Sequence, residues 1–164
     1  MKPTILFLFS MAILADVQGQ LKTTVKCPDF HIDILAGSVN KDIFPNATMG
    51  QIKLHLPCFT GIEKEGDSSK CGGGVFYKDK DIYFYTNRHY IEIGPAFKGT
   101  LSIPLMGAPR NGLFKWLGDP QIKDVHWDAF QTSYGILILY YNNASKVNKI
   151  QFSTENSNTI RLCD

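Results

Sequence analysis

Apolar and polar residues alternate with a period of two along much of the chain, from about Gln51 to Thr154. Alternation of this kind is typical of β-strands that bury one face, because successive side chains point to opposite sides of a sheet. Helical periodicity is nearly absent. The best helical candidate, Asp29 to Ala36, is short, and its β-branched residues fit a strand equally well. The predicted strands are residues 50–56, 81–86, 89–94, 98–106, 113–118, 124–130, 135–141 and 147–154.

The connections between these runs are short and rich in Gly, Pro, Asn and Asp, which are turn residues. Asn87-Arg88 is a candidate two-residue hairpin turn, and residues 107–112 form another turn. The polar, glycine-rich segment Gly61 to Gly74 predicts a long flexible loop. Its triple glycine is not a phosphate cradle, because neither Gly-Lys-Ser/Thr nor a helix follows it. Many short strands at such spacing predict an all-β antiparallel sandwich or barrel.

The N-terminus has the layout of a secretory signal peptide: Lys2, an apolar run from Ile5 to Ala15, and small or short residues before Gln20. We therefore expect residues 1–19 to be removed and residues 20–164 to form one secreted, extracellular domain. The apolar run is shorter than the roughly 20 residues of a membrane span, and no later stretch is long and apolar enough. The formal net charge is +2, with basic residues scattered among acidic ones, so nucleic acid is not an expected partner.

The cysteines of the mature chain are even in number, which in an exported protein indicates two disulfides: Cys27, Cys58, Cys71 and Cys163. From the residues alone, three connectivities are open. A zinc site is disfavoured because closely spaced cysteine pairs are missing, and no metal is expected. Two sequons, at Asn46 and Asn143, predict glycosylated surface loops.

The sequence carries no catalytic motif. The histidines are His31, His55, His89 and His126; they are far apart, and neither an HExxH nor a Gly-x-Ser-x-Gly pattern occurs. Asp124 and Asp128, on either side of Trp127, are the one carboxylate pair worth inspecting for glycoside chemistry, although turn and rim roles suit them better. We therefore predict no enzyme and no cofactor.

Aromatic residues are concentrated in about half of the chain, from Phe76 to Tyr141, and the strand ILILYY at 136–141 is apolar on both faces. Each face of that strand must therefore be covered. One face packs on another element, and the other faces a core or a cavity.

The stretch VHWDAFQTSYGILILYYN (Val125 to Asn142) resembles an adjacent strand pair of the lipocalins. In that family, an aromatic strand ends at a Thr-Asp-Tyr-like turn and a Tyr-Ala-Ile-Val-Tyr-like strand follows. Here the turn is Gln131 to Tyr134, and His126-Trp127 is similar to a pair in retinol-binding proteins. The order of elements and the cysteine near the C-terminus agree as well.

The resemblance implies an up-and-down, eight-stranded antiparallel barrel with an open mouth. Closure requires the strand at 147–154 to pair with a strand near the mature N-terminus. The resemblance also implies that Cys71 pairs with Cys163, which leaves Cys27 with Cys58. The competing scheme joins Cys58 to Cys71 and Cys27 to Cys163.

If the barrel is present, one face of the strands lines a cavity for a small hydrophobic ligand, with His126 or Tyr141 as the polar contact. The predicted cavity residues are Phe84, Trp116, His126, Phe130, Leu137, Leu139 and Tyr141. A shift of one residue in register replaces the later members of this set by Trp127, Ile136, Ile138 and Tyr140. The sequence thus predicts a secreted carrier. The alternative is a disulfide-bonded β-sandwich that acts by protein–protein interaction, with its aromatic residues as ordinary core.

Overall fold

The structure is a computed structural model that describes residues 25–66 and 69–163. The predicted signal peptide, residues 1–19, lies outside the described residues. Fifteen elements follow in order: β1 (Phe30–Asp33), β2 (Ser38–Val39), α1 (Met49–His55), β3 (Gly61–Glu63), β4 (Gly74–Tyr77), β5 (Ile82–Tyr85), η1 (Thr86–Arg88), β6 (Tyr90–Ile93), β7 (Gly99–Leu101), η2 (Arg110–Gly112), α2 (Phe114–Leu117), β8 (Ile122–Lys123), β9 (Trp127–Gln131), β10 (Ile136–Tyr141) and β11 (Val147–Ser153).

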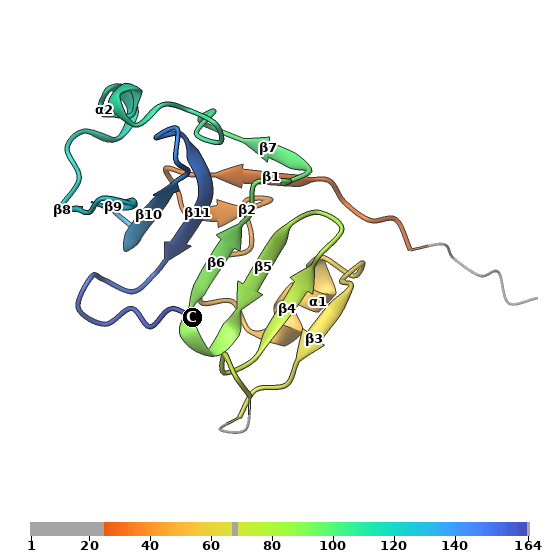
Figure 1. Cartoon of the computed structure of the whole chain (residues 1–164). Coiled ribbons are helices and arrows are strands. Elements are labelled where there is room, and N and C mark those ends of the chain that lie inside the picture. The colour runs from red at the N-terminus through yellow and green to blue at the C-terminus, as the bar shows by residue number, and fades with distance from the viewer. Residues whose placement is uncertain (1–24, 67–68, 164) are drawn as a thin grey trace, which may run out of the picture.

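Most of the strands belong to one eight-stranded antiparallel sheet, with the order β3-β4-β5-β6-β11-β10-β9-β8. Strands β3 to β6 follow one another along the chain, and so do β8 to β11 (Figure 1). The two groups meet where β6 pairs with β11, with Ile91 opposite Phe152 and Ile93 opposite Ile150. The predicted antiparallel β architecture is confirmed at this level.

The sheet is open, so the prediction of a closed barrel is wrong. Its end strands in the described chain are β3 and β8, which do not pair with each other. The last strand, β11, is occupied on both sides by β10 and β6, so it has no edge left for an N-terminal strand. The early strand β1 instead pairs with β2 and, in parallel, with β7 in a separate three-stranded sheet.

The hydrophobic core lies between one face of the large sheet and a second layer formed by the small sheet and α1. Phe30 of β1 makes an edge contact with Tyr77 of β4, with ring centroids 5.0 Å apart. Ile52 of α1 and Leu137 of β10 belong to the same buried cluster. This two-layer arrangement is sandwich-like, and its interior is filled with side chains.

The prediction of a strand at residues 50–56 is wrong, because residues 49–55 form α1. Ile52 and Leu56 are each only 1% exposed and are four residues apart, which places them on one side of a helix, whereas Leu54 between them is 78% exposed. The helix begins with a capping box, in which the Thr48 hydroxyl accepts from the Gln51 N–H and the Gln51 side chain accepts from the Thr48 N–H.

The prediction of a strand at residues 113–118 is also wrong, because this segment contains the short helix α2. Leu113 is buried, and Trp116 and Leu117 pack against the core, which is the i, i+3, i+4 spacing of a helix. Phe114, in contrast, is exposed. Of the run predicted at 98–106, only Gly99–Leu101 is a strand. The ambiguous segment 29–36 contains strand β1 and ends in a turn, and the Asn87-Arg88 turn belongs to the 3-10 helix η1.

Both disulfides have the pairing that the lipocalin resemblance implies: Cys27 with Cys58, and Cys71 with Cys163. The first joins the segment before β1 to the segment after α1. The second joins the segment before β4 to the end of the described chain, across a sequence separation of 92 residues. Two disulfides are typical of proteins that fold in an oxidising compartment.

Buried tyrosines make the stability of this fold sensitive to alkaline pH. Desolvation by burial raises the pKa of Tyr85 from its ordinary value of 10.0 to about 12. Burial also raises the pKa values of four other core or near-core tyrosines, Tyr77, Tyr90, Tyr134 and Tyr141. Above pH 10 the folded state therefore binds more protons than the unfolded state, and stability decreases as pH rises.

We expect the free energy of unfolding to decrease steadily between about pH 9.5 and about pH 11.5. Denaturant titrations at several pH values measure it, with tyrosinate absorbance recorded in parallel. Tyr134→Phe removes one of these ionisable groups, so its free energy of unfolding should decrease less steeply with pH than that of the wild-type chain. A free energy of unfolding that stays constant across this range would contradict the prediction.

Candidate functional site

The structure places the predicted cavity residues mainly in the packed core. Phe84, Phe130, Leu137 and Leu139 are buried there, and Tyr141 lies at its border with 8% exposure. Trp116 is partly buried against the same cluster. His126 is exposed in the turn before β9. The structure therefore has core packing on the face of the strands where the sequence predicted a ligand cavity.

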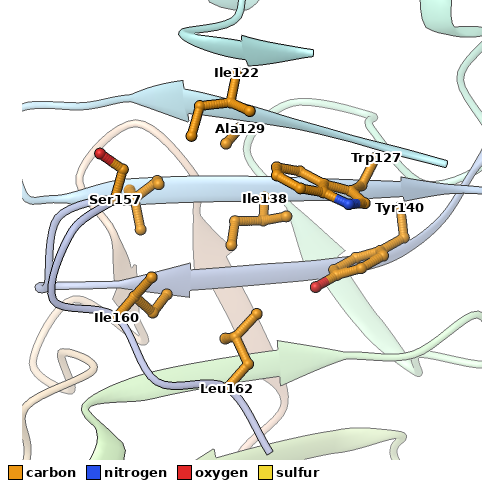
Figure 2. Close-up of a pocket in the computed structure, with 9 residues that line it drawn as sticks. Ile122, Trp127, Ala129, Ile138, Tyr140, Ser157, Ile160 and Leu162 are labelled. Atoms are coloured by element: carbon orange, nitrogen blue, oxygen red, sulfur yellow. The ribbon is translucent and has the colours of Figure 1, made fainter. Parts of the chain in front are cut away.

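An apolar pocket of about 220 Å³ lies on the opposite, outer face of the sheet. Figure 2 shows Trp127 and Tyr140 at one end of it, with Ser157 and Ile160 toward the other. The residues that line it are Ile122, Trp127, Ala129, Ile136, Ile138, Tyr140, Ser157, Ile160 and Leu162. They include all four residues of the shifted register, Trp127, Ile136, Ile138 and Tyr140.

Strand register explains how the floor of the pocket is assembled. Trp127 of β9 is opposite Tyr140 of β10, and Ala129 is opposite Ile138. Side chains of directly opposite residues lie on the same face of a sheet, so these four form one surface. Ala129 is the smallest of them and leaves the hollow that the larger side chains surround.

The wall of the pocket is the segment after β11, residues 155–163, which we call the C-terminal cover. Its apolar residues Ile160 and Leu162 pack against the small buried cluster of Ala129, Ile136 and Ile138. The cover is fixed at its end by the disulfide from Cys163 to Cys71. Without this segment, the apolar outer face of β9 and β10 would be open to water.

None of the described residues that line the pocket is charged. Polar groups stand instead at the border, where the Tyr140 hydroxyl hydrogen-bonds to Oε1 of Gln151 at 2.7 Å. The Gln151 amide donates to Glu92 at 2.6 Å, and the Lys149 ammonium lies 4.1 Å from the centre of the Tyr140 ring. A neutral, mainly apolar molecule therefore matches the interior, with polar groups available at this edge and at Ser157 toward the other end.

The carboxylate pair considered for glycoside chemistry has structural partners instead. Asp128 is 3% exposed. One of its carboxylate oxygens accepts from Arg110 Nε at 2.9 Å and from the Tyr141 hydroxyl at 2.7 Å. A second Arg110 nitrogen contacts the other carboxylate oxygen of Asp128. Burial, followed by the hydrogen bond to Asp128, raises the pKa of Tyr141. Asp124 is exposed and accepts from the His126 N–H at 3.0 Å, as in a turn.

The histidines lie apart from one another. His31 hydrogen-bonds to Thr100 at 2.7 Å and His89 to Glu155 at 3.1 Å, while His55 and His126 are exposed. Within residues 25–66 and 69–163, no group of three or more His, Cys, Asp or Glu side chains is placed to hold a metal ion.

Both sequon asparagines, Asn46 and Asn143, are exposed, as a glycan requires. In the described part of the chain, none of the helices has the length and apolar character needed to cross a lipid bilayer.

Sequence reasoning missed the contribution of the C-terminal cover. One signal was present, because both faces of Ile136–Tyr141 are apolar and a second covering element was therefore needed. The other was the apolar pair Ile160 and Leu162 at alternate positions just before Cys163. Neither signal shows which face carries the pocket.

The geometry thus defines a disulfide-bonded, antiparallel β protein with an apolar pocket between its sheet and its C-terminal segment. No protein-family model, curated protein or solved structure matches the chain.

Proposed function

We propose that the protein is a secreted binding protein that holds a small, neutral, hydrophobic ligand in the pocket under the C-terminal cover. The observation that carries this proposal is the pocket itself, which is lined by uncharged, mainly aromatic and aliphatic residues, with Ser157 as a polar member, from residues 122–140 and from the C-terminal cover. The signal-peptide-like N-terminus and the two disulfides support an extracellular location.

The size of the pocket limits the ligand. About 220 Å³ accommodates a molecule with up to three fused or linked rings, or a short alkyl chain. Burial of about 200 Å² of apolar ligand surface contributes roughly 5 kcal/mol before the costs of ordering the ligand. The protein would hold such a molecule by burial of apolar surface, and Trp127 and Tyr140 would provide ring contacts at one end.

Filling the pocket tests this function. Ala129→Leu adds apolar volume to the floor without burying a charge, so we expect it to weaken binding of the neutral dye N-phenyl-1-naphthylamine by at least about tenfold. Dye fluorescence and quenching of Trp127 emission measure binding, and circular dichroism checks the fold. Ala36→Leu, at an exposed position away from the pocket, is the matched control and should bind like the wild-type chain.

A wild-type chain that binds no apolar probe would overturn the proposal. It would favour instead the alternative of a sandwich protein that acts through protein–protein contacts.

A further inference from the structure

The C-terminal cover forms one wall of the pocket without being a strand of the sheet. Its backbone makes turn bonds within itself, where the Asn156 carbonyl accepts from the Thr159 and Ile160 N–H groups at 3.1 and 3.0 Å. Within the described residues, no backbone–backbone hydrogen bond joins residues 160–163 to β10, the strand they face. The cover is therefore held by side chains and by its end, not by a continuous ladder.

Attachments are concentrated at the two ends of the cover. At its start, Glu155 hydrogen-bonds to His89 at 3.1 Å and accepts from the Thr159 hydroxyl at 2.7 Å. These bonds, the one from Thr159 first, lower the pKa of Glu155. At its far end, the Cys163 N–H donates to the Tyr90 hydroxyl at 3.0 Å, and Arg88 donates to the Leu162 carbonyl.

The covalent attachment is at the far end as well. Cys163 is bonded to Cys71, which is buried beside the outer face of the sheet and belongs to the segment that leads into β4. Ile160 and Leu162, the two apolar residues that contact the pocket, lie between the attached ends. Displacement of this short stretch would open the pocket while leaving β9 and β10 intact.

We propose that the C-terminal cover is the gate of the pocket, and that the Cys71–Cys163 disulfide sets how long a bound molecule stays. This inference rests on the proposed function, because a gate needs a ligand. The disulfide keeps the apolar residues of the cover at high effective concentration over the pocket, so that each opening is brief. The cover supplies one wall of the pocket, so a bound molecule loses its contacts with Ile160 and Leu162 whenever the cover is displaced, and the dissociation rate therefore rises with the rate of displacement.

The test removes the tether and leaves the pocket lining unchanged. In the double variant Cys71→Ser/Cys163→Ser, we expect N-phenyl-1-naphthylamine to dissociate at least about tenfold faster than from the wild-type chain. Stopped-flow displacement of the bound dye measures the rate. The matched control is Cys27→Ser/Cys58→Ser, which removes the other disulfide away from the pocket and should leave the dissociation rate unchanged.

A second variant keeps both disulfides. Arg88→Gln removes the guanidinium that donates to the Leu162 carbonyl, so we expect a smaller increase in the dissociation rate, and faster amide hydrogen exchange in residues 160–163. This variant decides the question if the double cysteine variant does not fold.

The outcomes separate the gate from the function. A wild-type chain that binds no dye overturns the proposed function itself. Dye binding with the same dissociation rate in the wild-type chain, the Cys71→Ser/Cys163→Ser variant and Arg88→Gln overturns the gate alone. An equal increase after loss of Cys27–Cys58 also overturns it, because the effect would then follow general loss of stability.

Discussion

Leu139→Glu is expected to unfold the protein. Leu139 is fully buried in β10, opposite Ile150 of β11, within the packed cluster between the two layers. Transfer of an unpaired carboxylate into such a site costs several kcal/mol even after the group takes up a proton. That cost is comparable to the whole free energy of unfolding of a domain, about 5–15 kcal/mol.

Far-UV circular dichroism and a denaturant titration measure this effect, and the neighbouring residue provides the control. Ile138 points to the outer face and lines the floor of the pocket, so Ile138→Glu places its carboxylate in the pocket and not in the packed core between the two layers. We expect Ile138→Glu to retain the fold and lose binding of the apolar dye. A folded Leu139→Glu variant that has lost dye binding would show instead that the interior is a hydrated cavity.

Asp128→Ala is expected to lower the free energy of unfolding by about 1–3 kcal/mol, because it removes a buried carboxylate that accepts from the buried Tyr141 hydroxyl and from the partly exposed Arg110. The remaining Arg110 guanidinium would lose the two contacts with the carboxylate that neutralise it, and its centre would still lie 4.7 Å from the Tyr141 ring. The Tyr141 hydroxyl would lose its acceptor at the same time.

Equilibrium denaturation measures this loss, and two variants divide it into its causes. Asp128→Asn keeps an acceptor for Tyr141 and removes only the charge, so it should be less destabilising than Asp128→Ala. Asp124→Ala affects an exposed turn and should cost less than about 1 kcal/mol. If Asp128→Ala is as stable as the wild-type chain, the ion pair makes no net contribution to the free energy of unfolding.

The pattern of apolar runs and turn residues predicted several of the strands, and it failed where a helix has the same local pattern. Residues 82–85, 90–93, 136–141 and 147–153 are strands within the runs expected for them. In residues 50–56, however, the apolar residues Ile52, Leu54 and Leu56 fit two patterns. They alternate with a period of two, as in a strand. Ile52 and Leu56 also have the spacing of one side of a helix of two turns, with Leu54 on the solvent side. The capping box of Thr48 and Gln51 would have distinguished the two, because it satisfies helix N-terminal donors and has no role in a strand.

The sequence predicts an apolar site on this pair of strands, but it does not predict which face of the sheet carries the site. The sequence shows that both faces of Ile136–Tyr141 are apolar, and it yields the two alternative residue sets. The choice between them depends on which layer covers which face, and this is decided by the pairing of β11 with β6 and by the disulfide to Cys163. Such contacts join residues far apart in the chain, and local periodicity carries no information about them.

An open sheet, unlike a closed barrel, has two free edges, and free edges are where separate molecules add strands to one another and aggregate. Here both edges are very short: β8 has two residues and β3 has three. Lys123 in the first and Glu63 in the second bring charge to these edges. A neighbouring molecule would find too few unpaired backbone groups on either edge to continue the sheet, which protects the chain from self-association without the need for barrel closure.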